Sequence, residues 1–438
     1  MGLALLVYLF VGCSRANTAA IPGPHVPRSL LSPADLSPYV LAYCWQDPQG
    51  RQPSPDRGAR EVSLVIQAGD GSTAREVTPP PTLNPANVNM LACQGLDPTD
   101  FRRSLSGPVW RPRHDELTVV WGIARGLTNL QSYTVEIDLM TSADEAPIGA
   151  QDNAPYFLNP ERIFWSDDGS ILGVLAQDTE FGSHGRNIWL YNTETRDFTK
   201  ATFETRVGNA IGNAGWSGGG GRIGIGLGAP DSGIRIVDQR RPETAIEVSS
   251  ATRAELKQWP YALDSLLDFI TSPEELQQTL YLAEDSTPVW VVGDAHLIFL
   301  AAAEDGDAPL YLVDADGTNL RELLPNTEGV FGMPRLSPVG TELAFIRYPS
   351  WRNRGRVEIA KMDLSTQEVT SLVVVGAPEN GDELVISGLD WTPDGQFLAF
   401  SSNHGGESDI FVIRHDGTAW ANLTAIRPGD AIRPAWKR

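Results

Sequence analysis

The sequence predicts an all-β protein, a seven-bladed β-propeller that carries a small helical insertion. Three observations support this prediction. A strand–turn–strand pattern recurs about every 40–55 residues, each chain end holds part of one further copy, and turn residues are abundant, with 42 Gly and 32 Pro in 438 residues. A unit of four short strands cannot bury both of its faces alone, so copies must stack, and radial stacking gives a propeller.

Each copy begins with Trp or Leu, which a tight turn and an apolar run follow. The clearest copy runs from Trp391 to Thr424 and reads WTPDG, QFLAFSS, NHGGESD, IFVIRHDG and TAWANLT. The Asp-Gly or Gly-Gly pairs suit hairpin turns that need a positive φ. The copies start at Trp110, Trp165, Trp216, Trp290, Leu336, Trp391 and Trp436.

The two ends of the sequence are predicted to form one blade together. The last copy reaches only its first strand, whereas residues 39–45 and 62–78 have the character of the missing strands. Pairing of Ile432–Trp436 with Tyr39–Trp45 would close the ring and remove the aggregation risk of an unpaired edge. The alternative is that the C-terminal strand is a frayed end.

Two insertions interrupt the propeller, which we expect to span residues 35–438. Residues 80–106 are Pro-rich and irregular, whereas residues 251–285 have apolar residues at helical spacing and a Ser272-Pro273 helix start, which predicts two short helices. Strands in a blade alternate in direction, so the turns after first strands share one face, here named the turn face. The loops between second and third strands and the blade-to-blade connections share the other, the loop face.

The repeats resemble the propeller repeats of TolB, the periplasmic component of the Tol–Pal envelope system. Residues 389–424 show this most fully, with DWTPDGQFLAF, SSNHGGESDIFVIRHDG and NLT, while residues 163–175 and 334–346 match moderately. The resemblance covers residues 107–438 as repeats. No α/β domain like that of TolB precedes them, and the TolB ring is generally described as six-bladed, so we infer TolB-like repeats. Such repeats indicate a fold better than a function.

The N-terminus resembles a bacterial lipoprotein signal. An apolar run at residues 2–12 leads into LFVGCS, in which Cys13 would be lipidated, although Phe10 stands where Leu is usual and the first residues lack Lys and Arg. Residues 1–13 would then be the signal, and the Pro/Ala-rich residues 14–34 a tether. This predicts an extracytoplasmic protein anchored to a membrane by its N-terminal lipid. A cleaved signal without lipid and a cytosolic protein are the alternatives.

Cysteine usage and charge narrow the setting further. Besides Cys13 the chain has only Cys44 and Cys93, which an oxidising compartment would allow to form a disulfide; two buried thiols are the alternative. The formal net charge is −21, from 34 basic and 55 acidic residues. Such a chain repels phosphate backbones, so we do not expect a nucleic-acid partner.

Two groups of residues are candidates for binding. The segment RYPSWRNRGR concentrates residue types that are common at interaction hot spots. From it we predict that a partner contacts Arg347, Tyr348, Trp351, Arg352 and Arg354; a solvated loop is the alternative. Channel-lining residues are expected on first strands, and either line the channel mouth or form inter-blade ion pairs. They are Arg162, Arg335, Asp390 and Arg433.

A search for catalytic chemistry gives little. Ser217 lies in a G-x-S-x-G pattern, but that motif needs a strand-to-helix turn, and here it occupies a blade turn that leads into a strand. The six His residues show no metal-binding spacing. Oligogalacturonate lyases resemble this chain in having seven blades of TolB-like repeats, with a His-bound metal over the channel, yet only His184 and His404 are expected near that mouth. We therefore expect no catalytic residue, metal or other cofactor.

The leading hypothesis is a non-catalytic extracytoplasmic lipoprotein whose propeller binds a protein or cell-wall partner. The alternative is an enzyme that acts on acidic polysaccharide at the channel mouth, as the lyase resemblance implies. A third possibility is a purely structural lipoprotein, or a subunit that docks through the helices predicted for residues 251–285.

Overall fold

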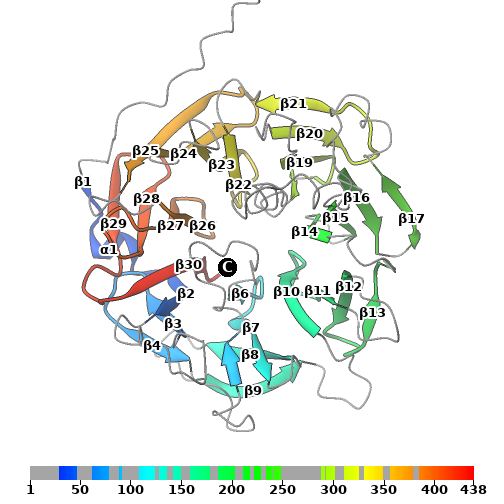
Figure 1. The fold of residues 1–438 in the computed structure, drawn as a ribbon, viewed down its shortest axis with the longest axis horizontal. Coiled ribbons are helices and arrows are strands. Elements are labelled where there is room, and N and C mark those ends of the chain that lie inside the picture. Colours follow the sequence, from blue (N-terminus) through cyan, green and yellow to red (C-terminus); the bar gives the residue numbers. More distant parts are fainter. Residues whose placement is uncertain are drawn as a thin grey trace, which may run out of the picture.

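The computed structural model shows an all-β propeller, which confirms the predicted fold class (Figure 1). Its only helix among the described residues is α1 (Pro33–Leu36). No helix in this part of the chain is long and apolar enough to cross a membrane. The structure describes residues 29–46, 62–77, 88–90, 108–123, 128–135, 142–148, 158–177, 186–202, 211–217, 221–227, 233–239, 241–247, 288–291, 293–300, 310–324, 330–348, 356–377 and 384–438.

The described strands form seven sheets arranged around a ring, which we number in ring order. Sheet 1 holds β30 (Asp430–Trp436), β2 (Val40–Gln46), β3 (Val62–Ala68) and β4 (Ala74–Val77). Sheet 2 holds β5 (Val88–Met90), β6 (Val109–Trp110), β7 (Glu116–Ile123), β8 (Thr128–Val135) and β9 (Ser142–Ile148). Sheet 3 holds β10 (Leu158–Trp165), β11 (Ile171–Gln177), β12 (Arg186–Asn192) and β13 (Phe198–Lys200). Sheet 4 holds β14 (Ile211–Trp216), β15 (Arg222–Leu227), β16 (Gly233–Asp238) and β17 (Arg241–Glu247).

The remaining sheets complete the ring. Sheet 5 holds β18 (Val289–Trp290), β19 (His296–Leu300), β20 (Leu310–Asp314) and β21 (Arg321–Leu324). Sheet 6 holds β22 (Val330–Leu336), β23 (Glu342–Tyr348), β24 (Arg356–Asp363) and β25 (Val369–Gly376). Sheet 7 holds β26 (Ile386–Trp391), β27 (Phe397–Ser402), β28 (Asp409–Arg414) and β29 (Ala419–Asn422), with β1 (Ser29–Leu30) at its outer edge.

Six of these sheets repeat one regular four-strand order, and sheet 2 departs from it. In sheet 2 both β5 and β6 pair with β7, because β6 spans only two residues and leaves part of the β7 edge free for β5. The prediction of seven blades is therefore corrected to six regular blades, with sheet 2 as an irregular member of the ring. The insertion expected at residues 80–106 supplies β5, and the helices predicted for residues 251–285 lie outside the described residues.

The ring is closed by strands from both chain ends, as predicted. Strand β30 pairs antiparallel with β2, with Cys44 opposite Ile432 and Leu41 opposite Trp436. The innermost strands contact one another in the cyclic order β30, β6, β10, β14, β18, β22 and β26, and β26 contacts β30 again. No open edge therefore remains at this seam between sheets 7 and 1.

The repeated turn explains why the sequence forms hairpins at these positions. In sheet 7 the hydroxyl Oγ1 of Thr392 accepts a hydrogen bond from the amide of Phe397 at 3.0 Å. The Asp394 carboxylate accepts one from the amide of Gln396, and Gly395 takes a φ of 71°. Gly tolerates this left-handed conformation at little cost. Ser and Thr at this position thus cap the turn.

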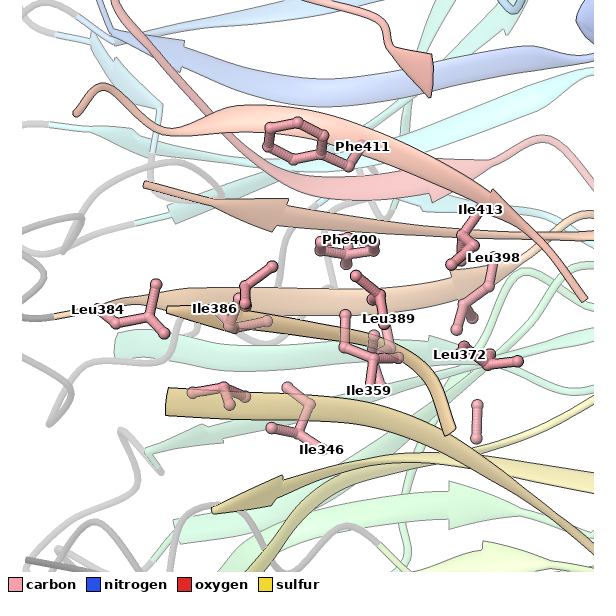
Figure 2. Packing of buried hydrophobic residues seen from close by; sticks show 14 of the residues in the cluster. Ile346, Ile359, Leu372, Leu384, Ile386, Leu389, Leu398, Phe400, Phe411 and Ile413 are labelled. Atoms are coloured by element: carbon pink, nitrogen blue, oxygen red, sulfur yellow. The ribbon is translucent and has the colours of Figure 1, made fainter. Parts of the chain in front are cut away.

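Apolar strands from adjacent sheets form the core. Figure 2 shows the cluster between sheets 6 and 7, where Leu389, Leu398 and Phe400 face Ile346 and Ile359. All of these side chains are at most 2% exposed. Full burial of each such residue contributes roughly 1.5–3 kcal/mol, so the inter-sheet contacts dominate the stability of the ring.

Candidate functional site

The channel mouth on the turn face gathers charged residues from several sheets. Arg113, Asp167 and Asp294 occupy first-to-second strand turns of sheets 2, 3 and 5, and Arg438 follows β30. The C-terminal end of the chain lies at the centre of the ring (Figure 1). Because the innermost strands all end near the axis, these turns converge there. We call these four residues together with Asp390 of β26 the channel-mouth cluster.

Asp390 holds the closing strand in place. Its Oδ2 accepts a hydrogen bond from the backbone amide of Trp436 at 2.6 Å, and its Oδ1 accepts one from Nη2 of Arg438 at 3.0 Å. The Asp390 carboxylate raises the pKa of Arg438, with burial acting in the opposite direction. Lys437, between them, pairs with Asp115 in the turn of sheet 2 at 2.5 Å. Asp390 was predicted to line the channel or form an inter-blade ion pair, and it forms such a pair.

Asp167 is influenced by neighbouring charges of both signs. Burial raises its pKa, Arg438 and Arg113 act against that rise, and Asp294 adds to it. Its side chain is nevertheless exposed, so it sits in a crowded position that solvent still reaches. The cluster therefore combines three carboxylates with two guanidinium groups.

Backbone strain marks the same region. Arg113, Asp294 and Arg433 have φ values of 61°, 56° and 55°, in the left-handed region that non-Gly residues rarely adopt. Arg433 stands three residues before Trp436, the last residue of β30. Gly388 stands at the same distance before Trp391 in β26 and has a φ of 69°. Burial lowers the pKa of Arg433 to about 10. Met333 of β22 has a φ of 48° at the same position, and the pairing register shifts there in all three strands, so the conformation of Arg433 belongs to a bulge that the first strands repeat.

Arg335 and Arg162 were also predicted to line the channel. Arg335, in β22, donates through Nη1 to the carbonyl of Pro334 at 2.9 Å, and its own carbonyl accepts from the indole of Trp391. Arg162 lies in β10, and its side chain is outside the described residues. The structure therefore brings Asp390 to the cluster and leaves a channel role for Arg162, Arg335 and Arg433 as a prediction.

The predicted partner-binding segment is partly inside the fold. Arg347 and Tyr348 are the last residues of β23 and are buried, at 9% and 6% exposure. Arg347 forms an ion pair with Glu358 of β24, and Tyr348 joins the core between sheets 6 and 7. These two residues are corrected from an exposed loop to strand positions, because β23 continues further than expected. Trp351, Arg352 and Arg354 lie outside the described residues.

The residues considered for catalysis have structural partners. Ser217 is fully buried, and its Oγ accepts a hydrogen bond from the amide of Arg222 at 3.1 Å, as the turn reading predicts. The His404 ring packs on Phe411 at 4.7 Å between ring centres, and burial lowers the pKa of His404. His184 is outside the described residues. Within the described part of the chain, no three His, Cys, Asp or Glu side chains are grouped to hold a metal ion.

Two of the three cysteines are outside the described residues. Cys44 is buried in β2 and forms a disulfide bond. Cys93 and Cys13 both lie outside the described ranges, so the Cys44–Cys93 pairing and the lipidation of Cys13 stay predictions.

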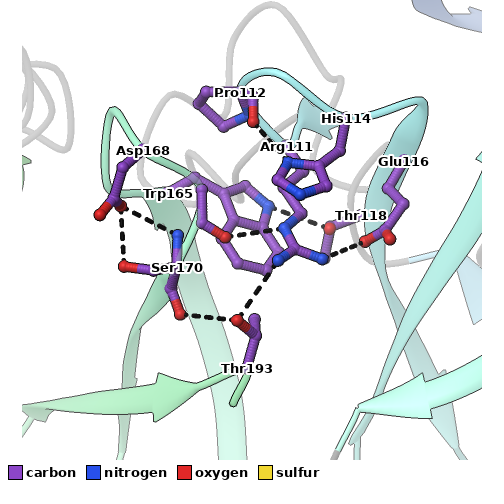
Figure 3. Close-up of polar contacts among 10 residues, drawn as sticks. Arg111, Pro112, His114, Glu116, Thr118, Trp165, Asp168, Ser170 and Thr193 are labelled. Carbon is purple, nitrogen blue, oxygen red and sulfur yellow. Dashed lines mark hydrogen bonds and ion pairs between the residues drawn. The ribbon is translucent and has the colours of Figure 1, made fainter.

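Sequence reasoning missed Arg111, which joins sheets 2 and 3 (Figure 3). Its Nε donates to the carbonyl of Gly169 at 2.7 Å, its Nη1 pairs with Glu116 at 2.9 Å, and its Nη2 donates to Thr193 at 3.3 Å. The guanidinium also lies 5.1 Å from the centre of the Trp165 ring. The signal was available, since Arg111 stands where four other copies have the turn Ser or Thr.

Comparison with known proteins supports a TolB-like propeller. No family model matches the chain. It is 30% identical over 127 residues to a protein TolB homolog from Chlorobaculum tepidum, which is 29% of this chain and 26% of that protein. The matched part thus spans about a quarter of the relative. The repeats predicted from the sequence to be TolB-like are confirmed as such.

The solved structures that resemble this chain share little sequence identity with it, so they bear on its fold and not on its function. The β-propeller domain of the Trilobed protease from Pyrococcus furiosus, described as having an open velcro topology, superimposes with a TM-score of 0.54 at 11% identity, over 93% of this chain and 96% of that one. Here, in contrast, β30 and β2 close the ring. An oligogalacturonate lyase in complex with manganese gives a TM-score of 0.49 at 14% identity, over 87% and 83% of the two chains. This second likeness carries no argument about function.

Proposed function

We propose that this TolB-like propeller is a non-catalytic, extracytoplasmic lipoprotein that binds a protein or cell-wall partner in the cell envelope. The observation that carries the proposal is the 127-residue match to a TolB homolog, because the TolB repeats that the chain resembles belong to an envelope protein. The lipoprotein-like segment LFVGCS ending the apolar N-terminal run adds an independent indication of export and anchoring.

Side chains that could do chemistry have structural roles in the described part of the chain, which supports the function of a binding scaffold. Ser217 caps a turn, His404 packs on an aromatic ring, and Asp390 holds the closing strand. A rigid closed ring presents its connecting loops without rearrangement, and loops on such scaffolds commonly carry binding. The loop face is therefore the surface on which we place the partner.

Within the loop face we place the contact on Trp351, Arg352 and Arg354. Arg347 and Tyr348 are withdrawn from this set, since both are buried and their replacement would disturb sheet 6 rather than a binding surface. Trp and Arg are residue types in which binding energy concentrates.

A crosslinking pull-down from intact cells tests the proposal. Wild type is compared with Trp351→Ala/Arg352→Ala and with the control Arg196→Ala, which removes an exposed Arg from a turn on the opposite face. We expect a partner that wild type and control capture and that the double variant loses by tenfold or more. Equal capture by all three proteins would refute this surface.

Lipid anchoring is tested separately. Cys13→Ser should abolish incorporation of labelled fatty acid and move the protein out of the membrane fraction. Retention of the label in this variant would show that Cys13 is not the lipidated residue.

The alternative is an enzyme acting on acidic polysaccharide, like the oligogalacturonate lyases. The favouring observation is Arg433, a half-buried basic residue on the innermost strand β30 of a protein whose formal net charge is −21. The test is formation of unsaturated product from oligogalacturonate with and without manganese, in wild type and Arg433→Gly. Activity lost only in the variant would favour the enzyme over the scaffold.

A further inference from the structure

An N-terminal strap, residues Ser29–Tyr39, crosses the seam between sheets 7 and 1. Its strand β1 pairs in parallel with β29, and the amide of Leu31 donates to the carbonyl of Trp420 at 2.9 Å. Leu31 and Leu36 are 7% and 1% exposed, and both pack into the cluster shared by the two sheets. Residues 29–34 of the strap were expected to belong to the tether over residues 14–34, and the structure corrects this, since β1 begins at Ser29 and α1 at Pro33.

Polar contacts fix the strap at both ends of its short helix. Ser32 and Asp35 form a reciprocal capping box at α1. The hydroxyl of Tyr39 donates to Oδ2 of Asp394 in the turn of sheet 7 at 2.6 Å, and the amide of Gly69 donates to the carbonyl of Tyr39 at 2.8 Å. The point at which the chain meets the ring is therefore set by the fold.

The register of β1 shows at which face that point lies. Ser29 is opposite Ala419, the first residue of β29, and Leu30 is opposite Trp420. Strand β29 follows the hairpin that connects it to β28, and such third-to-fourth strand turns lie on the turn face together with the first-to-second turns. Because β1 runs parallel to β29, the chain enters the strap at the turn-face end of the rim, beside β29 in Figure 1.

We propose that the strap orients the propeller, so that the turn face points toward the surface that holds the N-terminus and the loop face points away from it. This inference rests on the proposed function for the identity of that surface, a membrane reached through Cys13. The partner is then a molecule that approaches from the side opposite the anchoring membrane, such as a cell-wall or free protein component, and not a neighbour within that membrane.

The point where the strap joins the ring makes this orientation the shorter path. The 15 residues between Cys13 and Ser29 are rich in Pro and Ala and reach about 46 Å when extended, at about 3.1 Å per residue. A seven-residue strand is about 23 Å long, which approximates the height of the ring. With the loop face toward the membrane, the tether would use about half of that reach along the rim, whereas with the turn face toward the membrane it would use none of it there.

The turn face carries ionised carboxylates, which anionic lipid repels, so attraction to lipid does not account for this orientation. Hydrogen bonds within their own turns lower the pKa of several turn-face carboxyls, which therefore stay ionised. These are Asp70, Asp168, Asp314, Asp363 and Asp416. We infer that the tether, and not lipid contact, sets the orientation, which then survives high salt.

Energy transfer from labelled protein to labelled lipid tests the proposal. The full-length lipidated protein carries a donor at Val339→Cys, in a turn-face turn and 61% exposed, or at Ile426→Cys, on the loop face and 92% exposed. In vesicles with acceptor-labelled headgroups we expect at least twofold higher transfer from position 339, in low and in high salt. Equal transfer, or higher transfer from position 426, would overturn the proposal.

Two further proteins separate the effect of the strap from the effect of the lipid anchor. Leu31→Asp places a charge in the strap's apolar contact and should reduce the difference between the two positions; an unchanged difference would show that the strap does not orient the ring. The full chain with Cys13→Ser and an N-terminal oligohistidine segment, bound to nickel-chelating lipid, repeats the measurement without lipidation. If native protein does not enter membranes but this form shows the difference, lipid anchoring fails and the orientation stands.

Discussion

The indole nitrogen of Trp391 donates a hydrogen bond to the carbonyl oxygen of Arg335 in the neighbouring sheet, 3.2 Å away. The same bond occurs at three further positions, and each acceptor is the residue just before the Trp or Leu that begins the adjacent copy. These bonds run from Trp110 to Ala435, from Trp216 to Phe164 and from Trp290 to Gly215. The indole of Trp165 instead donates to Oγ1 of Thr118 in sheet 2. The Trp at these five positions therefore both fills the core and connects adjacent sheets, whereas Leu336 has no indole to donate.

Trp391→Phe should separate these two contributions. Phe keeps most of the apolar contact but removes the donor, leaving the Arg335 carbonyl without this partner, so we expect a loss of about 1–2 kcal/mol in the free energy of unfolding. The measurement is the urea midpoint. The control is Trp420→Phe, since Trp420 stacks on Phe411 and is partly buried. An equal loss in both variants would assign the effect to aromatic packing.

Arg111 gives a second test of how sheets are joined. Arg111→Lys keeps the charge but cannot donate to Gly169, Glu116 and Thr193 together, because an ammonium group lacks the planar fork of guanidinium. We expect a loss of about 2 kcal/mol. Arg113→Lys, an exposed change in the same turn, is the matched control and should leave the thermal midpoint unchanged. Similar midpoints for both variants would contradict the clamp in Figure 3.

The sequence predicted the strands and turns because their signals are local, and it predicted ring closure because each chain end has the strands that the other lacks. Turn chemistry at Thr392, Asp394 and Gly395 and the alternating apolar runs fix each hairpin within about ten residues. The bond from Trp391 to Arg335 could not be predicted in this way, because its partners are 56 positions apart and belong to different sheets. The irregular pairing of sheet 2 was hidden for the same reason, since β5 comes from an insertion without a repeat pattern.

The site was predicted less well, for reasons that particular residues make clear. Arg347 and Tyr348 have the composition of an exposed loop, yet Glu358, on the adjacent strand, neutralises the arginine and allows it to be buried. The first part of the strap, residues 29–34, was predicted to be a tether because this region is Pro-rich, although Ser32 followed three residues later by Asp35 is a capping-box signal. Asp390 was correctly placed near the axis, but its bond to Trp436 depends on ring closure.

The buried pair in sheet 6 gives a third prediction. Arg347→Leu leaves Glu358, which is 1% exposed, as an uncompensated buried charge, so we expect a loss of about 3–5 kcal/mol. Because removal of both charges restores an apolar pairing, Arg347→Leu/Glu358→Leu should recover most of that loss. The measurement is the thermal midpoint of each protein. A double variant no more stable than the single one would show that the pair does not carry the effect.

The last prediction concerns Tyr39 and Asp394 at the seam. Tyr39→Phe removes the hydroxyl that donates to Asp394 at 2.6 Å, while the ring contacts with Phe397 and Trp436 remain. We expect a loss of about 1 kcal/mol near neutral pH. The matched control is Tyr311→Phe, whose hydroxyl bonds to Glu322 within sheet 5 at 3.3 Å and which should change stability less.

The pH dependence of that loss identifies its cause. Burial alone would raise the pKa of Asp394, but hydrogen bonds from Tyr39, Gln396 and Thr392 lower it overall, so this contribution is present above the unfolded pKa of about 4 and fades as pH falls below it. Burial and Asp394 raise the pKa of Tyr39, so the contribution is present below the unfolded pKa of about 10 and fades as pH rises above it. Wild type and Tyr39→Phe should therefore differ most between roughly pH 5 and 9, and the difference should shrink as pH falls through the lowered pKa of Asp394. A difference that stays unchanged down to the acid end of the folded range would assign the loss to ring packing, because protonation of Asp394 weakens a bond to its carboxylate.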